Sequence, residues 1–259
     1  MKLRFIVTLI LLNLTSYFSF GQFGYAAEYG FFVGGFSLQS DYGAREEFSS
    51  SYANMGYTIG GFYYLNFAYS SNYNYSSSGY FGDHFKLRAE LSFSKTDLQH
   101  YGKYVDGSKN SVMARQLRAM HGTTSIADLG LQLEYFPTSI RDFTSSIGVL
   151  RPYFTGGIHG DYYIPKVESD LGNINTPLTT PEKYFGGLSN ATNFTYSLSF
   201  GGGLRYRLNE AIDLFLDARY QYFFTDWIDG VSPNSILYPE NKSNDTLVLL
   251  NFGYVYYFE

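Results

Sequence analysis

The clearest pattern in the chain is a strict alternation of apolar and polar positions in its last third. From Phe194 to Arg207 every second residue is apolar or glycine, and the residues between them are small or charged. The same alternation returns from Ile212 to Phe224 and from Val248 to Phe258. A period of two residues, held over a dozen positions, predicts β-strands with one apolar and one polar face.

Shorter stretches of the same alternation occur earlier, and together they predict eight strands. Their apolar positions fall around residues 29–33, 57–65, 85–93, 127–135 and 154–158. Long polar connections are expected at about 39–54, 96–122, 163–192 and 225–244, and the other connections at about 67–82, 137–149 and 208–211. Strands joined in this way predict an all-β fold, an eight-stranded antiparallel transmembrane β-barrel.

Alternation alone fits a soluble sandwich or a lipocalin-like barrel as well, since each of these folds buries one apolar face. Three features favour the membrane. The apolar face carries tyrosine and phenylalanine toward the strand ends, where interfacial aromatic girdles lie. Strands of ten to fourteen residues suit a tilted bilayer crossing. The charges of the polar faces also cancel, as a narrow closed lumen requires, because unpaired buried charge is costly.

The predicted luminal network consists of equal numbers of cations and anions. The cations are Lys86, Arg88, Arg151, Arg205, Arg207 and Arg219, and the anions are Glu90, Asp128, Glu134, Asp161, Asp213 and Asp217. An eight-stranded barrel is only wide enough for side chains to fill its interior. We therefore expect a polar, side-chain-filled lumen that disfavours diffusive transport.

The N-terminal segment predicts export. Two basic residues precede an apolar run from Phe5 to Leu12, and Ser19 and Gly21 supply the small residues wanted before a cleavage point, which is the pattern of a secretory signal peptide. We expect residues 1–21 to be removed and residues 22–259 to form one barrel domain. The apolar run is shorter than the about 20 residues that a membrane-spanning helix needs, so insertion is expected through strands.

Composition excludes several classes of function. The chain has 27 tyrosines, 24 phenylalanines and 27 glycines but no cysteine. The lack of cysteine excludes a disulfide scaffold and a thiolate metal site. A net charge of −5 with scattered basic residues argues against nucleic acid as a partner.

The C-terminal residues Asn251, Gly253, Tyr256 and Phe258 follow the pattern polar-x-Gly-x-x-aromatic-x-aromatic. This pattern resembles the outer-membrane assembly signal read by the barrel assembly machinery, although Glu259 follows where phenylalanine is normally last. The resemblance implies a Sec-exported protein of the bacterial outer membrane, with the barrel assembly machinery as its partner during biogenesis.

The mature chain resembles small OmpA-like and OmpX-like outer-membrane barrels of Bacteroidota, including the PorG-like barrel of the type IX secretion system. The segments Glu28–Gly35 and Arg151–Gly157 and the start at Gln22 carry the resemblance. Family members attach periplasmic or surface partners to the membrane. The long connection 96–122 departs from what this family leads one to expect.

His159 is the one candidate for a catalytic residue: it shares the polar face of its strand with Asp161 and could be a base oriented by that carboxylate. The alternative is that both residues belong to the luminal ion-pair network. The chain contains no Gly-x-Ser-x-Gly elbow, and Asp41, Glu46 and Glu47 are too sparse for a calcium loop. We therefore expect no catalytic residues, no cofactor and no metal.

The segment 113–120 has apolar residues at helical spacing and predicts a short surface helix. Its Arg115 and Arg118 could contact a partner or lipopolysaccharide phosphates, or the helix could merely cover a barrel mouth. The sequence thus predicts a non-enzymatic anchor or accessory subunit of an outer-membrane complex, such as a type IX secretion assembly. The expected partners are outer-membrane lipids, lipopolysaccharide and other outer-membrane or periplasmic proteins. A porin-like channel and a lipid A-modifying enzyme are the alternatives.

Overall fold

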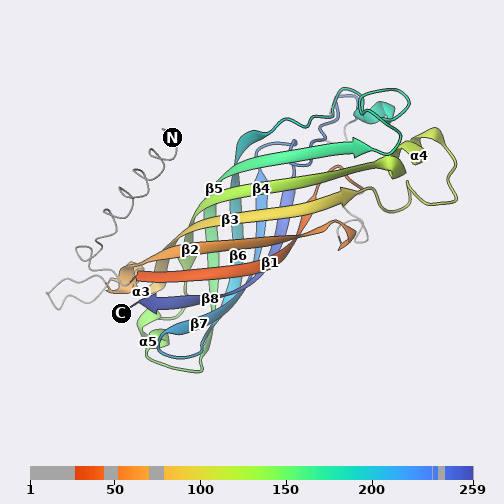
Figure 1. The fold of residues 1–259 in the computed structure, drawn as a ribbon. Coiled ribbons are helices and arrows are strands. Elements are labelled where there is room, and N and C mark those ends of the chain that lie inside the picture. The colour runs from red at the N-terminus through yellow and green to blue at the C-terminus, as the bar shows by residue number, and fades with distance from the viewer. Residues whose placement is uncertain (1–26, 44–51, 70–78, 235, 239–242, 259) are drawn as a thin grey trace, which may run out of the picture.

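The structure is a computed structural model, and it describes residues 27–43, 52–69, 79–234, 236–238 and 243–258. Within them eight strands close into one antiparallel barrel in sequence order (Figure 1). The strands are β1 (Ala27–Gln39), β2 (Met55–Asn66), β3 (Phe85–Gln99), β4 (Met120–Tyr135), β5 (Leu150–Ser169), β6 (Asn193–Arg207), β7 (Ile212–Phe223) and β8 (Thr246–Phe258). The predicted barrel is confirmed. The predicted signal peptide lies outside the described residues.

The two ends of the barrel differ, and we name them the terminal end and the loop end. Ala27 pairs with Phe258 at the terminal end, which also carries the short helices η2 (Phe67–Tyr69), α3 (Tyr80–His84) and α5 (Ile140–Thr144). At the loop end β3, β4 and β5, of 15, 16 and 20 residues, run beyond their neighbours (Figure 1). This end carries α4 (Val112–Ala119) and η3 (Glu182–Tyr184). No helix among the described residues is long and apolar enough to cross a bilayer.

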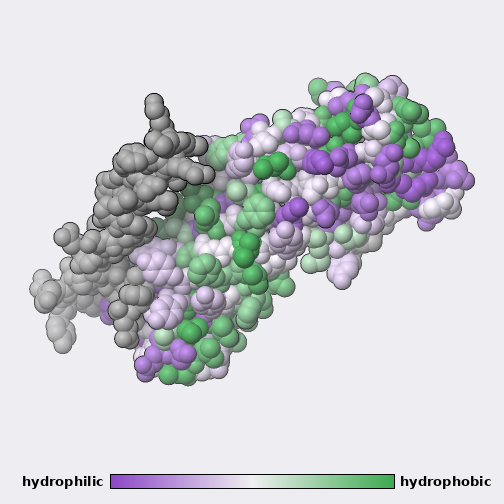
Figure 2. Space-filling view, in the orientation of Figure 1, coloured by the Kyte–Doolittle hydropathy of each residue, from purple (hydrophilic) through white to green (hydrophobic). Residues whose placement is uncertain are grey.

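The middle of the wall is apolar on its outside. Ile59, Leu91, Leu129, Ile158 and Phe200 lie on five different strands, and each exposes more than half of its surface. Soluble monomers rarely leave a continuous apolar belt exposed, whereas a transmembrane barrel turns such a belt to lipid. In Figure 2 green apolar patches mark the wall, and purple hydrophilic side chains gather over the loop end. The apolar face predicted for each strand is therefore the outward face.

Toward the loop end the outward face of the strands becomes polar and the inward face becomes apolar. On β3 the outward residues Leu91 and Phe93 are followed on the same face by Lys95, Asp97 and Gln99. The inward positions become apolar in the same region, as shown by the buried Leu98, Met120, Ile126, Tyr163 and Val167. The pleat itself continues without a break, so the exchange marks the height at which lipid gives way to water.

Two predicted loops are therefore partly strand. β3 runs to Gln99 and β4 starts at Met120, within the connection expected at 96–122, and β5 runs to Ser169, within the connection expected at 163–192. Those expectations were wrong because they followed an apolar outward stripe, which stops at the membrane boundary although the strands go on. The predicted short helix is present as α4, where the hydroxyl of Ser111 accepts the N–H of Ala114 as an N-cap.

A hydrophobic core fills the loop end, and we call the part of the chain built around it the cap. Its buried members come from strand ends and from connections, namely Phe36, Leu38, Tyr42, Leu98, Leu117, Met120, Ile126, Tyr163, Val167, Tyr184, Leu188, Phe223, Ile228, Val231, Leu247 and Leu249. Apolar side chains inside and polar ones outside are the arrangement of a water-soluble β-protein. The cap thus closes the barrel above its membrane-spanning part.

Two asparagines protect the edges of the protruding strands. The Asn54 amide donates to the carbonyl of Gln99 at 3.0 Å and accepts the N–H of Gln99 at 2.9 Å. Asn190 accepts the N–H of Val167 at 2.7 Å and donates to its carbonyl at 3.3 Å. Each side-chain amide makes the two hydrogen bonds that a neighbouring strand would make. Covered edges of this kind do not recruit further strands.

Candidate functional site

The interior of the membrane-spanning part holds paired charges near the terminal end. Lys86 Nζ donates to both carboxylate oxygens of Glu28, at 2.8 and 2.7 Å. Arg205 donates to Glu134 at 3.0 Å and to the Tyr64 hydroxyl at 2.7 Å. All five side chains are buried. Since an unpaired ion costs several kcal/mol in such surroundings, the pairs are what makes this interior possible.

A second group of charges spans the middle of the lumen. Arg88 on β3 forms an ion pair with Glu90 and approaches Asp217 of β7 at 3.5 Å. Arg219 of β7 binds Glu90 at 2.9 Å and Asp217 at 3.3 Å. The Arg88 guanidinium also lies 3.9 Å from the centre of the Phe62 ring. These contacts tie β3 to β7 across the barrel and leave the lumen filled with side chains.

Inward-facing glycines make room for the aromatic part of this filling. A Cβ on Gly30 would lie 2.1 Å from the Phe62 ring, and one on Gly253 would lie 2.7 Å from the Phe215 ring. A Cβ atom does not approach non-bonded atoms this closely, so a larger residue would force the rings to move. Glycine at these positions is therefore a packing requirement.

His159 organises the network nearer the cap. Its Nδ1 lies 2.9 Å from Asp128 Oδ1 on β4, and its Nε2 lies 2.7 Å from Ser199 Oγ on β6. A Cβ on Gly130 would come within 2.5 Å of the same ring. The carboxylate beside His159 is thus Asp128. Asp161, the partner expected from the sequence, instead accepts a hydrogen bond from Ser197 at 2.6 Å.

Ser199, His159 and Asp128 stand in the order of a nucleophile, a base and an orienting carboxylate. All three are buried, with 5%, 4% and 6% of their surface exposed. A substrate carbonyl must come within about 3–3.5 Å of the attacking oxygen, which this burial prevents unless the cap opens. No group of three or more histidine, aspartate or glutamate side chains among the described residues is arranged to hold a metal ion.

The cap contains buried polar groups of its own. Asp229 accepts the N–H groups of Asp41 and Val231 at 2.9 and 2.8 Å. Burial, and secondly the Asp41 carboxylate, raise the pKa of Asp229 well above its usual value. Burial also lowers the pKa of His100 to about 3, so that its neutral ring accepts the N–H of Gly43 at 3.2 Å. These bonds join distant connections of the chain into one folded cap.

The structure buries eleven of the twelve predicted luminal charges inside the barrel. Arg151 is the exception and corrects the prediction. It lies half-buried at the terminal end, where it donates to the carbonyl of Ser139 at 3.2 Å and lies 5.8 Å from the centre of the Phe143 ring of α5. Arg151 lies on the inward face of β5, but it is the second residue of that strand, at the mouth of the barrel.

Sequence reasoning did not place Glu28 among the luminal charges, although the alternation of β1 puts it on the inward face. Counting Glu28 and omitting Arg151 changes six cations and six anions into five cations and seven anions. Asp128 and Asp161 face each other across β4 and β5, next to His159. The balance expected from the sequence is therefore only approximate.

The two arginines of α4 have different surroundings. Arg118 donates to the carbonyls of Val105, Asp106 and Lys109 at 3.4, 3.0 and 3.1 Å, which fixes the preceding loop. Arg115 is exposed. Arg118 is thus engaged within the chain, and Arg115 is the one that faces solvent.

The residues of the C-terminal pattern occupy defined places in β8. Asn251 faces inward and donates to Asp217 at 2.9 Å. Gly253 also faces inward, against Phe215, whereas Tyr256 faces outward. Phe258 pairs with Ala27 on β1. These positions help to close the barrel.

No family model and no curated protein matches the chain. Neisserial surface protein A resembles it with a TM-score of 0.45 and 12% identity, over 90% of this chain and 97% of that one. A major outer membrane protein from Thermus thermophilus resembles it with a TM-score of 0.46 and 12% identity, over 90% of this chain and 99% of that one. For the outer membrane protein OprG from Pseudomonas aeruginosa the TM-score is 0.40 and the identity 13%, over 92% of this chain and 99% of that one. At such identities the likeness concerns the fold alone. By its own fold and lumen the chain is an eight-stranded transmembrane β-barrel with a polar, side-chain-filled interior.

Proposed function

We propose that the chain is a non-enzymatic barrel of the bacterial outer membrane that anchors its cap at the cell surface and serves as an accessory subunit of an outer-membrane complex. Small outer-membrane barrels keep their termini and short turns in the periplasm. The terminal end would therefore face the periplasm, and the cap would face outward.

One observation carries this proposal: side chains block the interior of the barrel at two heights. The charge network of Arg88, Asp217 and Arg219 crosses the membrane-spanning part, and the hydrophobic core closes the loop end. A barrel closed in this way offers no continuous path for solutes. Anchoring and presentation of the cap are functions that a closed barrel can still perform.

Two experiments test the proposal. Purified full-length protein in planar bilayers should give no stable current steps, and stable steps would favour a porin-like channel instead. Chemical cross-linking in intact outer membranes, followed by purification and mass spectrometry, should recover a reproducible set of outer-membrane or periplasmic proteins. A type IX secretion component in that set would support the setting suggested by the Bacteroidota resemblance. Recovery of the barrel alone would refute the subunit role.

The second candidate is an ester hydrolase of the kind that modifies lipid A, and the contacts of His159 with Ser199 and Asp128 favour it. The burial of Ser199 weighs against it. A fluorophosphonate probe, which labels activated serines, distinguishes the two. The anchor proposal expects no labelling at Ser199, and labelling that Ser199→Ala or His159→Ala abolishes would establish the hydrolase.

A further inference from the structure

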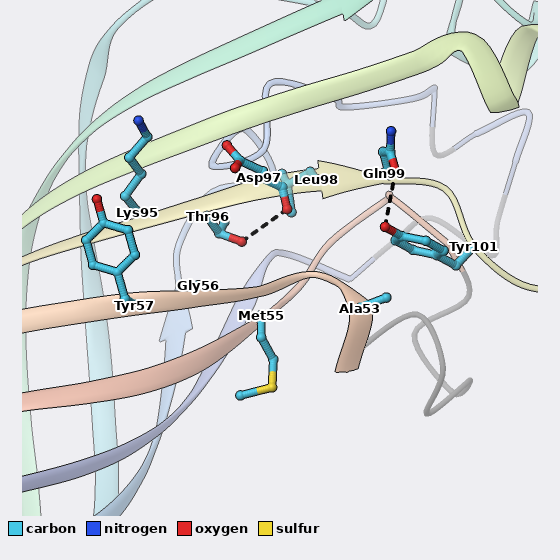
Figure 3. Close-up of a pocket in the computed structure, with 10 residues that line it drawn as sticks. All are labelled: Ala53, Met55, Gly56, Tyr57, Lys95, Thr96, Asp97, Leu98, Gln99 and Tyr101. Atoms are coloured by element: carbon cyan, nitrogen blue, oxygen red, sulfur yellow. Dashed lines mark hydrogen bonds between the residues drawn. The ribbon is translucent and has the colours of Figure 1, made fainter.

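A cavity lies on the outer wall at the height where the apolar belt meets the cap. Figure 3 shows the residues that line it. It lies between the start of β2 and the end of β3, and its volume is about 330 Å³. The side chains that line it include Tyr57, Lys95, Asp97, Gln99 and Tyr101. Small-molecule sites have volumes of about 300–1,000 Å³, so the cavity suits a ligand group of modest size.

The cavity results from the way two strands part. Pairing between β2 and β3 ends at Tyr57 and Lys95, whereas β3 continues beside β4 as far as Gln99. Beyond the last pair, Asn54 reaches back to the backbone of Gln99. The wall is therefore held together below and above the cavity but is open beside Asp97. Because regular strands frame it, the shape of the cavity is fixed before a ligand arrives.

The polar groups of this cavity suit hydroxyl groups better than phosphate. Lys95 offers a donor, Asp97 an acceptor, and the Gln99 amide both, with its oxygen already accepting from Tyr101 at 3.1 Å. Neither Lys95 nor Asp97 forms an ion pair with any other residue in the part of the chain described. A sugar hydroxyl both donates and accepts, so such a mixed set can satisfy it. A phosphate would meet the negative charge of Asp97 together with the single cation.

Aromatic and apolar side chains complete the site on its membrane side. Tyr57, 57% exposed, stands beside Lys95 (Figure 3) and offers a ring for the C–H face of a sugar. The next outward pair, Ile59 and Phe93, is 53% and 43% exposed within the apolar belt. An acyl chain attached to a sugar in the cavity could lie along this pair without leaving the lipid.

From this juxtaposition we propose that the cavity between β2 and β3 binds the sugar headgroup of a glycolipid from the surrounding leaflet. The cavity holds the sugar by hydrogen bonds to Lys95, Asp97 and Gln99, and the belt below it holds the acyl chains. The proposal needs the membrane setting of the barrel but not its role as an anchor, so the conductance and cross-linking experiments above succeed or fail independently of it.

The test is an affinity measurement on full-length protein in non-ionic detergent micelles. The probe is fluorescently labelled deep-rough lipopolysaccharide, which carries core sugars on acyl chains, and binding is read as fluorescence anisotropy. We expect saturable binding that the unlabelled glycolipid displaces. Free core oligosaccharide should displace it only at concentrations at least about tenfold higher, because it lacks the acyl contacts. Phosphatidylglycerol, which has acyl chains but no sugar, should not displace it.

Variants locate the site. Asp97→Ala and Gln99→Ala should each weaken binding by roughly tenfold, the effect of losing well-placed hydrogen bonds. The matched control removes Lys166 and Glu168, an exposed ion pair at 2.9 Å on the outward face of β5, by the double change Lys166→Ala and Glu168→Ala. Heat-dependent migration on gels confirms that each variant is folded.

Any of four results would overturn the inference. Asp97→Ala and Gln99→Ala could bind the glycolipid as the wild type does, or the β5 control could lose as much affinity as they do. Displacement by phosphatidylglycerol, or by the free oligosaccharide at the same concentration as the glycolipid, would show that the site does not recognise a sugar joined to acyl chains.

Discussion

The buried pair Lys86–Glu28 allows the luminal network to be tested energetically. Both side chains are almost fully buried, at 1% and 0% exposure, and their ion-pair distance is 2.7 Å. Lys86→Met keeps most of the volume but leaves the Glu28 carboxylate with Asn66 at 2.5 Å and Arg205 at 3.9 Å. Removing one partner of a buried pair costs about 3–5 kcal/mol, because the remaining charge loses its compensation. We expect a loss of this size in the free energy of unfolding.

The double variant Lys86→Met with Glu28→Gln removes both charges and should recover most of that loss. Replacing a whole buried pair is often neutral, so its stability should return to within about 1 kcal/mol of the wild type. Urea unfolding in lipid vesicles, followed by the gel mobility of the folded barrel, measures all the variants. If Lys86→Met is as stable as the wild type, or if the double variant is no more stable than Lys86→Met, the pairing is refuted.

Other predictions concern packing, edges and pH. Gly130→Ala would push a methyl group against His159 and should destabilise the barrel by about 1–3 kcal/mol in the same urea assay; stability equal to the wild type would show that the ring is free to move. Asn190→Ala leaves the edge of β5 at Val167 uncovered and should lower cap stability by about 1–3 kcal/mol; the fluorescence of the single tryptophan, Trp227, which packs on the cap core, reports this. His100 has a folded pKa of about 3 against an ordinary value of 6.5, so its contribution to cap stability is complete above pH 6.5 and is lost as the pH falls toward 3. The raised pKa of Asp229 acts with the opposite sign, since its contribution to stability is lost as the pH rises. The wild type is therefore compared with His100→Asn, which should lose less of the Trp227 fluorescence signal as the pH falls. Identical pH profiles of the two proteins would contradict the assignment to His100.

The barrel and its faces were predictable because lipid imposes a simple rule on the outward residues. Leu129, Leu131 and Leu133 show that rule on β4 without interruption. The rule says nothing above the bilayer, so the last residues of β3 and the first of β4 looked like loop. From Lys95 on, the outward face of β3 becomes polar, and its inward face becomes apolar at Leu98. These residues can be recognised as strand only when the polarity of both faces is followed together.

The contacts inside the lumen depend on the register of neighbouring strands, which could not be predicted from the alternation of apolar and polar residues. His159 lies directly opposite Gly130, and this register places its ring beside Asp128, two residues away on β4. The sequence alone indicates Asp161 as the partner, because Asp161 lies two residues from His159 on the same face of β5. In a barrel the neighbours across strands matter as much, and their alignment is set by hairpin geometry.

In the membrane, the apolar belt contacts lipid while the cap stands in water. The chain has no cysteine, so single cysteines at Leu129, Ile158, Asp97 and Lys166 can each carry a spin label on the protein reconstituted in liposomes. Power-saturation spectra should show labels at Leu129 and Ile158 relaxed by oxygen, which concentrates in lipid, and labels at Asp97 and Lys166 relaxed by a water-soluble nickel complex. Equal access of the nickel complex to all four positions would contradict the account, because the belt would then face water.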